Sequence, residues 1–239
     1  KYNYEINSKV LSGFAQAQFK YNRVDFYIGA SVSNTNYQRN GLFENGNYPG
    51  TESFGEGEKQ NFTDLGVKGG AIYKVTGKHL IDVNLGYISK APSIRNTFTN
   101  ARQNNAVSIG LESEKIQNMD IGYIFRSPIV KARITGFYSN FKDGSDLGFY
   151  FTENISGLGL EQDAFIQEVM TNVEKQYIGG ELGIEAQVTP TIKLKGAASM
   201  GQYTYSNSPN LYITSDDLEG PVSFGNGTTK LKNYHVAGG

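Results

Sequence analysis

Few residues of this sequence have the type and spacing that enzyme chemistry needs. Its two histidines, His79 and His235, lie far apart, in or beside segments that alternate like β-strands. The chain has no cysteine, which excludes disulfides, thiol catalysis and cysteine-bound metals. Neither a phosphate-binding glycine loop nor a G-x-S-x-G nucleophile motif is present. We therefore predict that the chain is not an enzyme and needs no cofactor.

Two groups of acidic residues are candidates for metal binding. Asp143 and Asp146 lie in one polar segment, and Asp216, Asp217 and Glu219 lie in another. Carboxylate oxygens are ligands for Ca²⁺, but neither spacing matches the EF-hand loop. Because a solvated acidic loop explains both groups, we predict no metal site. Binding of Ca²⁺ by a loop stays an open alternative.

Residues suited to hold a ligand are concentrated in the long polar segments between the strand-like stretches. Aromatic residues and arginine are enriched where proteins bind their partners. We expect ligand contacts within this set: Arg39, Phe43, Tyr48, Arg95, Phe98, Arg102, Phe149, Tyr150, Phe151 and Tyr212. Any single member could instead pack inside its own loop, so the prediction concerns the set.

The clearest structural element between these residues is the stretch 115–143. Its residues alternate between apolar and polar types, which is the period-two pattern of a β-strand and not that of a helix. We predict two strands joined by a tight turn, whose central pair is either Ser127-Pro128 or Pro128-Ile129. Both alternatives place the apolar residues of the two strands on one face, namely Ile121, Tyr123, Phe125, Val130, Ala132 and Ile134. Each strand has about ten alternating residues, enough to cross a bilayer when tilted.

The same alternation recurs along the chain. Further strand pairs are expected at 11–21 with 24–32, 62–75 with 81–87, and 178–188 with 192–200, and a last strand near Lys230. Short turns near residues 22, 77, 128 and 190 alternate with long loops, roughly 34–60, 89–108, 143–171 and 206–227. In the third loop, Phe165, Ile166, Val169 and Met170 have helical spacing, so we predict a short helix over Leu160–Met170.

This alternation of short and long connections is typical of outer-membrane barrels, which have short periplasmic turns and long extracellular loops. We predict an all-β fold, an antiparallel transmembrane β-barrel segment of about nine strands, with residues 1–239 in a single barrel domain. Closed bacterial barrels have even strand numbers, so an odd number indicates part of a larger barrel. A soluble β-sandwich would also alternate, but it would not explain why every second connection is long.

The composition agrees with a barrel and limits other classes. Hydrophobic residues make up 38% of the 239 residues, below the usual share for a packed globular core. No apolar run approaches about 18 residues, which excludes a membrane-spanning helix. The formal charge of −1 gives no reason to expect nucleic acid as a partner. A polar lumen wall of mixed charge is expected from Asp120, Lys131, Arg133, Glu181, Glu185, Lys193 and Lys195.

One stretch, Tyr87-Ile88-Ser89-Lys90-Ala91-Pro92, resembles the TonB-dependent outer-membrane receptors where a strand enters an extracellular loop. Asn104-Asn105, Leu111–Lys115 and Asp120–Tyr123 follow in the order and spacing of that family. The stretch 233–239 is similar to a strand start in the large Bacteroidota members. The resemblance covers most of the chain and is firmest over residues 66–143.

The resemblance implies a 22-stranded barrel with an N-terminal plug, whose loops bind a scarce nutrient that is imported with force from TonB. The plug, the TonB box and the aromatic final strand are missing from these residues. Expected partners are outer-membrane lipid, TonB through the missing N-terminal part, an unknown nutrient and a surface lipoprotein. A passive porin and an adhesive or structural barrel are the alternatives. Loop composition does not identify the substrate.

Overall fold

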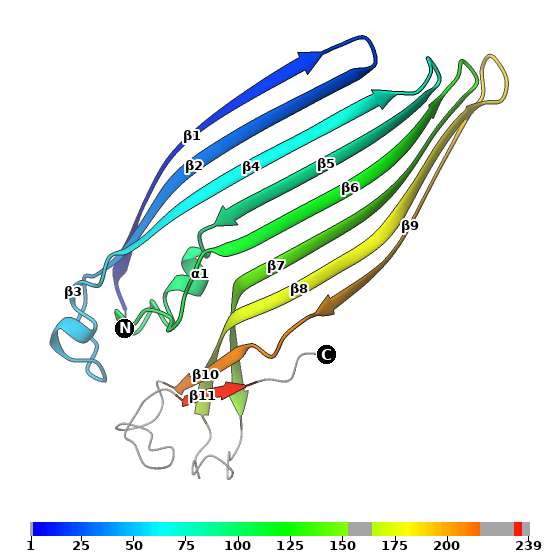
Figure 1. The fold of residues 1–239 in the computed structure, drawn as a ribbon. Helices are drawn as coiled ribbons and strands as arrows, with labels where there is room; N and C mark the ends of the chain where they lie inside the picture. The colour runs from blue at the N-terminus through cyan, green and yellow to red at the C-terminus, as the bar shows by residue number, and fades with distance from the viewer. Residues whose placement is uncertain (1, 153–163, 216–231, 236–239) are drawn as a thin grey trace.

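The computed structural model describes residues 2–152, 164–215 and 232–235 of the chain, and its strands form one antiparallel sheet (Figure 1). The strands are β1 (Tyr4–Lys20), β2 (Val24–Gly41), β3 (Gly55–Glu56), β4 (Gln60–Lys74), β5 (His79–Lys90), β6 (Glu114–Arg126), β7 (Val130–Thr152), β8 (Ala164–Gln187), β9 (Lys193–Tyr205), β10 (Asn210–Ser215) and β11 (Lys232–His235). A 3-10 turn, η1 (Gly50–Glu52), and one helical turn, α1 (Ile94–Thr97), complete the described elements. No helix among the described residues is long and apolar enough to span a membrane.

The order of strands in the sheet follows the chain. It runs β1-β2-β4-β5-β6-β7-β8-β10-β11, with β3 beside β2 and β9 beside β8. Because β9 and β10 pair with successive stretches of the same edge of β8, the sheet has nine positions across its width, in agreement with the expected number. Within the described residues β1 pairs only with β2, so the sheet is open and the barrel is not closed here.

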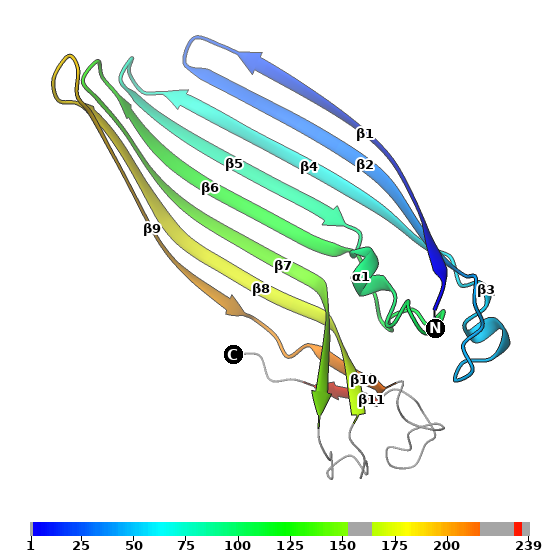
Figure 2. The same cartoon turned by 180° about the vertical axis from the view of Figure 1, so that it is seen from behind.

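Short turns gather at one end of the sheet and the longer connections at the other (Figure 2). Residues 21–23, 75–78, 127–129 and 188–192 form the short turns, as predicted. In the β6–β7 turn, the Ser127 N–H donates to the Val130 carbonyl oxygen at 2.8 Å, and the Val130 N–H donates to Ser127 Oγ at 2.9 Å. Pro128 and Ile129 are therefore the central pair, a position that suits a proline because it has no N–H to donate.

The pairing register separates one apolar face from one polar face. Phe125 lies opposite Ala132, and Tyr123 lies opposite Ile134, so the predicted outer face of this hairpin is confirmed. Ile134 in turn lies opposite Leu182 of β8, and the same parity continues across the sheet. The large side chains of this face stay exposed. An uncovered apolar face with a polar opposite face is the arrangement of a lipid-facing barrel wall.

The prediction of an irregular stretch at 143–171 was wrong for residues 143–152 and 164–171, and so was the part of the predicted helix over 164–170. Instead β7 extends to Thr152 and β8 begins at Ala164, with Tyr150 opposite Ile166. Irregular pairing between Phe141 and Asp146 interrupts the alternation that would have signalled a strand. Hydrogen bonding to a neighbouring strand on each side outweighs the helical spacing of the side chains. Residues 160–163 of the predicted helix lie outside the described part of the chain.

Two further boundaries differ from the sequence prediction. β2 continues to Gly41, eight residues into the expected loop, because side-chain amides support the pairing where apolar residues end. The Asn34 amide, for example, donates to Asn61 Oδ1 on β4 at 2.9 Å. Similarly, β10 lies within the expected loop 206–227, where its backbone pairs with β8. The barrel wall thus extends beyond its apolar band at the long-loop end.

Candidate functional site: a cleft at the long-loop end

The segment between β5 and β6, residues 91–113, covers the polar face of the sheet at its long-loop end. Phe98 is only 2% exposed and packs with Tyr37 of β2 and Phe62 of β4. Both residues have the parity of the polar face, since Thr35 lies opposite Phe62 and the apolar Val32 lies opposite Leu65. The loop therefore folds over the interior side of the wall and leaves the apolar face free.

Arg39 at the end of β2 holds two loops in place. Its side chain is 1% exposed, and its Nε donates to the Ala101 carbonyl oxygen at 2.8 Å. Its Nη1 donates to the Ser53 carbonyl oxygen at 2.9 Å and to Asn105 Oδ1. The guanidinium carbon lies 5.2 Å from the centre of the Tyr4 ring, a cation–π distance. Burial lowers the pKa of Arg39 from its ordinary value.

These contacts bury Arg39 and use the Nε and Nη1 donors of its guanidinium, so we assign it a positioning role. Predicted as a ligand contact, it instead ties the loop that contains Ser53 to the loop that contains Ala101 and Asn105. Only its type, and not its sequence position, indicated that it is important. Its acceptors are loop backbone and amide groups up to 66 residues away in the chain, so no local pattern could have shown them.

Four of the ten candidate residues come together in one cleft of about 600 Å³, namely Arg95, Phe98, Arg102 and Phe149. They come from α1, the segment that follows it and the extension of β7. Nine residues that sequence reasoning missed also line it, among them Tyr4, Ile6, Leu147 and Phe165. Tyr4 and Ile6 belong to the edge strand β1, and Phe165 belongs to the segment predicted as a helix. Only the fold brings these distant stretches together.

Helix α1 is fixed against β7 by hydrogen bonds that orient the cleft. Ser93 caps α1, because its Oγ accepts from the Asn96 N–H at 3.2 Å. The Asn96 amide donates to the Ser145 carbonyl oxygen at 2.7 Å, and Arg95 Nη2 donates to the Leu147 carbonyl oxygen at 3.2 Å. One face of the cleft is thus built from a helical turn that is tied to a strand.

The remaining five candidates lie outside this cleft. Tyr48 is buried in its own loop, where its carbonyl oxygen accepts from the Ser53 hydroxyl at 2.6 Å. Phe43 and Phe151 are exposed. The Tyr150 hydroxyl donates to Glu168 Oε1 at 3.2 Å, and burial raises the pKa of this phenol, as does the nearby carboxylate of Glu168. Tyr212 lies on β10 opposite Val169.

The described residues offer no arrangement for a metal ion. Among them, no group of three or more histidines and carboxylates is placed to hold one. Asp143 forms an ion pair with Lys115, whose Nζ lies 2.6 Å from Asp143 Oδ2. Asp216, Asp217 and Glu219 lie outside the described residues.

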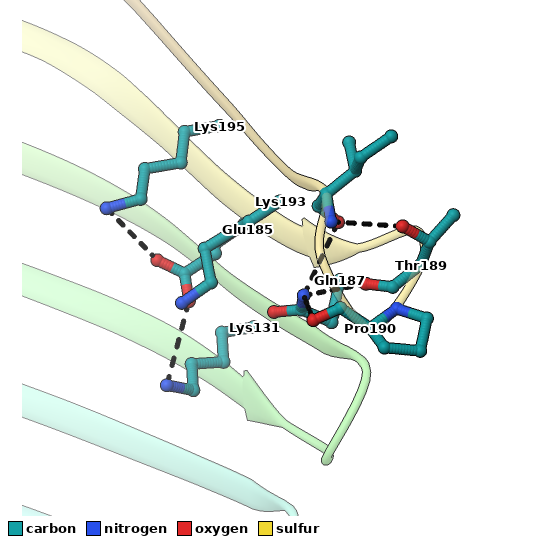
Figure 3. A network of polar contacts seen from close by, with 8 residues as sticks. Lys131, Glu185, Gln187, Thr189, Pro190, Lys193 and Lys195 are labelled. Carbon is teal, nitrogen blue, oxygen red and sulfur yellow. Dashed lines mark hydrogen bonds and ion pairs between the residues drawn. The ribbon is translucent and has the colours of Figure 1, made fainter.

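The residues predicted to form the lumen wall lie on the polar face, where ion pairs and hydrogen bonds connect neighbouring strands. The Glu185 carboxylate lies 3.2 Å from Lys193 Nζ, 3.4 Å from Lys195 Nζ and 3.7 Å from Lys131 Nζ (Figure 3). Here three ammonium groups from β7 and β9 share one carboxylate from β8. Farther along the wall, the Asn84 amide donates to Asp120 Oδ1 at 2.9 Å.

The family of the chain follows from a comparison over almost its whole length. The model of the TonB dependent receptor-like beta-barrel matches residues 1–234. The chain belongs to the TonB-dependent receptor family. It is thus part of an outer-membrane β-barrel, and the resemblance to this family is confirmed. The nearer likeness to Bacteroidota members stays a prediction.

Two solved structures, one of a transporter and one of a receptor, were matched to this TonB-dependent receptor barrel. The copper transporter OprC is 16% identical, with a TM-score of 0.60 over 85% of this chain and 31% of OprC. The siderophore receptor PirA from Pseudomonas aeruginosa is 10% identical, with a TM-score of 0.31 over 90% of this chain and 52% of PirA. The chain thus spans about a third of OprC and half of PirA, and the likeness to OprC shows the fold alone. A comparison with curated proteins gives no match.

Proposed function

We propose that the full-length protein is a nutrient importer whose extracellular loops bind the substrate and whose plugged barrel admits it with force from TonB. The observation that supports this best is the cleft at Arg95, Phe98, Arg102 and Phe149. It lies where the long loops fold over the polar, interior side of the wall. A molecule bound there would be held at the outer entrance of the lumen. Concave sites with a few polar groups are the usual form of small-molecule binding sites.

Copper is a poor candidate for the substrate of this cleft. None of the described residues that line it is histidine or methionine, and the chain has no cysteine. Those residues are the ligands that select copper in proteins. Unlike a copper site, the cleft described here is suited to an organic molecule.

The test is depletion of nutrients from a defined mixture by cells that express the full-length protein. Mass spectrometry would follow each compound in strains with and without the protein, and with and without TonB. We expect at least one compound to be depleted only where both are present, because a plugged lumen admits nothing until the plug is moved. The same depletion without TonB, or steady conductance of the purified protein in a planar bilayer, would support a passive porin instead. A surface lipoprotein partner stays a prediction.

A further inference from the structure

The two arginines of the cleft differ in their contacts from Arg39 and Arg133. Arg39 is buried and donates to three loop acceptors, and Arg133 forms an ion pair with Asp82. Neither Arg95 nor Arg102 forms an ion pair with any described carboxylate, and no described residue lining the cleft is acidic. Both side chains are exposed to solvent. Among the described residues, therefore, no carboxylate compensates the two positive charges of the cleft.

The contacts of both guanidinium groups leave donors available. Arg95 commits one N–H to the Leu147 carbonyl oxygen, out of the five that a guanidinium carries. The Arg102 guanidinium carbon lies 5.7 Å from the centre of the Tyr2 ring, a cation–π distance, and no hydrogen bond of this group to a described residue is seen. A guanidinium edge matches the two oxygens of a carboxylate, so the charge and the geometry both favour an anion.

The apolar part of the cleft is a flat aromatic surface. The rings of Phe149 and Phe165 are stacked, with centres 5.9 Å apart and planes inclined by 17°. They are 38% and 42% exposed, whereas Leu147 beside them is buried. Partly exposed phenyl rings offer a flat group both apolar contact and aromatic stacking. One cleft thus combines two partly exposed phenyl rings with two cations that pair with no described carboxylate.

We infer that this cleft takes a small organic acid with a flat, apolar body. Its anionic group lies at Arg95 and Arg102, and its body lies on Phe149 and Phe165. The inference rests on the proposed function, because it names the class of nutrient that this cleft captures. A neutral or cationic molecule of the same shape lacks the group that the arginines bind.

Binding of three naphthalene probes to the purified full-length protein tests this assignment. The probes are 2-naphthoate, the neutral 2-naphthamide and the cationic 2-naphthylmethylammonium, measured by equilibrium dialysis with a correction for partition into detergent micelles. We expect saturable binding of naphthoate, at least about tenfold tighter than that of naphthamide, which corresponds to one modest charge-assisted contact. Binding of the cation is expected to be weaker still. Added salt should weaken naphthoate binding only.

Variants locate the site. The double substitution Arg95→Gln with Arg102→Gln should reduce naphthoate binding to the level of naphthamide and leave naphthamide unchanged. Arg126→Gln, at the short-turn end, is the matched control and should bind like the unaltered protein. Gel mobility of unheated samples checks that each barrel is folded, and the single Arg102→Gln variant replaces the double one if that does not fold. Phe149→Leu should weaken naphthoate and naphthamide alike.

Three results would overturn the inference: no saturable naphthoate binding, equal binding of all three probes, or binding that the arginine variants leave intact. Each is measured on purified protein without TonB. Failure here therefore concerns the ligand class alone and leaves the importer proposal to the depletion assay. Conversely, depletion of organic acids without TonB would reject energy-coupled import while the assignment of the cleft stands.

Discussion

Arg133 Nη2 lies 2.7 Å from Asp82 Oδ2, so an ion pair joins β7 to β5 across the intervening strand β6. The residue it crosses is Gly122, which lies opposite Asp82 on one side and Thr135 on the other. A Cβ atom at Gly122 would stand 2.2 Å from Asp82 Oδ1. The absence of a side chain there is what lets a carboxylate that is 5% exposed reach a guanidinium two strands away.

Replacing this glycine should destabilise the barrel. We expect Gly122→Ala to lower the free energy of unfolding by about 1–3 kcal/mol, the usual cost of an overpacked site, because the added methyl group displaces the carboxylate. Gly136→Ala is the matched control, since a Cβ there meets nothing within 4 Å. Thermal unfolding of the full-length protein in detergent measures both. Equal midpoints for the two variants would show that Asp82 moves aside at no cost.

A double-mutant cycle should show that Asp82 and Arg133 are coupled. Arg133→Met leaves a buried carboxylate without its partner, whereas Asp82→Asn removes the charge from the buried side. We expect a coupling energy between the roughly 1 kcal/mol of an exposed pair and the roughly 3–5 kcal/mol of a buried one, since only Asp82 is buried. The double variant should be more stable than Arg133→Met alone. Additive effects of the two substitutions would contradict an interaction between them.

The lipid-facing assignment is tested with two neighbouring residues of β9. Ala198 lies opposite Leu182 on the apolar face, and Ser199 lies opposite Glu181 on the polar face. Ala198→Arg should cost about 2–4 kcal/mol of folding free energy in a membrane, because it places a charge in hydrocarbon. Ser199→Arg should be tolerated, since it faces the interior beside a carboxylate. The measurement is the folded fraction of each variant in liposomes. A lower folded fraction for Ser199→Arg than for Ala198→Arg would mean that the lipid-facing and interior faces are assigned the wrong way round.

The three lysines around Glu185 predict a salt-dependent stability. In Glu185→Gln, the ammonium groups of Lys131, Lys193 and Lys195 repel one another without the carboxylate between them. We expect a lower unfolding temperature at low ionic strength, and recovery as salt screens the repulsion. Glu181→Gln is the control, because the structure shows no ion pair for Glu181 among the described residues. A deficit that persists at high salt would indicate lost packing and not lost charge compensation.

Loss of Arg39 should loosen two loops together. In Arg39→Lys the charge remains, but the single ammonium group cannot reach the same three acceptors in a fixed fork. We expect faster amide hydrogen exchange in both 42–59 and 91–113, with little change in the short turns. Arg102→Gln is the control, because Arg102 is exposed. Faster exchange in only one loop would mean that the two loops are held independently.

Period-two alternation was sufficient to predict the hairpins. On its lipid side each strand is covered by no other part of the protein, and every second residue must therefore be apolar. The same rule explains the failure at 143–171. Beyond the membrane both faces are polar or loop-covered, and the left-handed backbone of Asp143 (φ 57°) shifts the register. In such segments the strand is maintained by pairing with its neighbours, which the local sequence does not report.

Residue type could nominate members of the candidate cleft but could not show their arrangement, and ligand contact by these residues stays a prediction. Arg95, Phe98, Arg102 and Phe149 were in the expected set and line one cleft. Arg39 was in the set for the same reason and proved to be a structural tie. Arg39 differs from the arginines of the cleft in the number of hydrogen-bond acceptors near its guanidinium group. The positions of these acceptors depend on loops that fold across several strands.

From β1 to β9, each long strand of this wall pairs with the long strand before it in the chain, and only the two-residue β3 interrupts the series. Contacts between residues close in sequence form quickly, because little chain entropy is lost in bringing them together. The wall can therefore form one hairpin at a time, because each added strand pairs with the exposed edge of the previous one. Joining the two outer edges of the finished barrel is the single step without such a local template. The speed of maturation should accordingly be set by the closure of that seam and not by the pairing of successive strands.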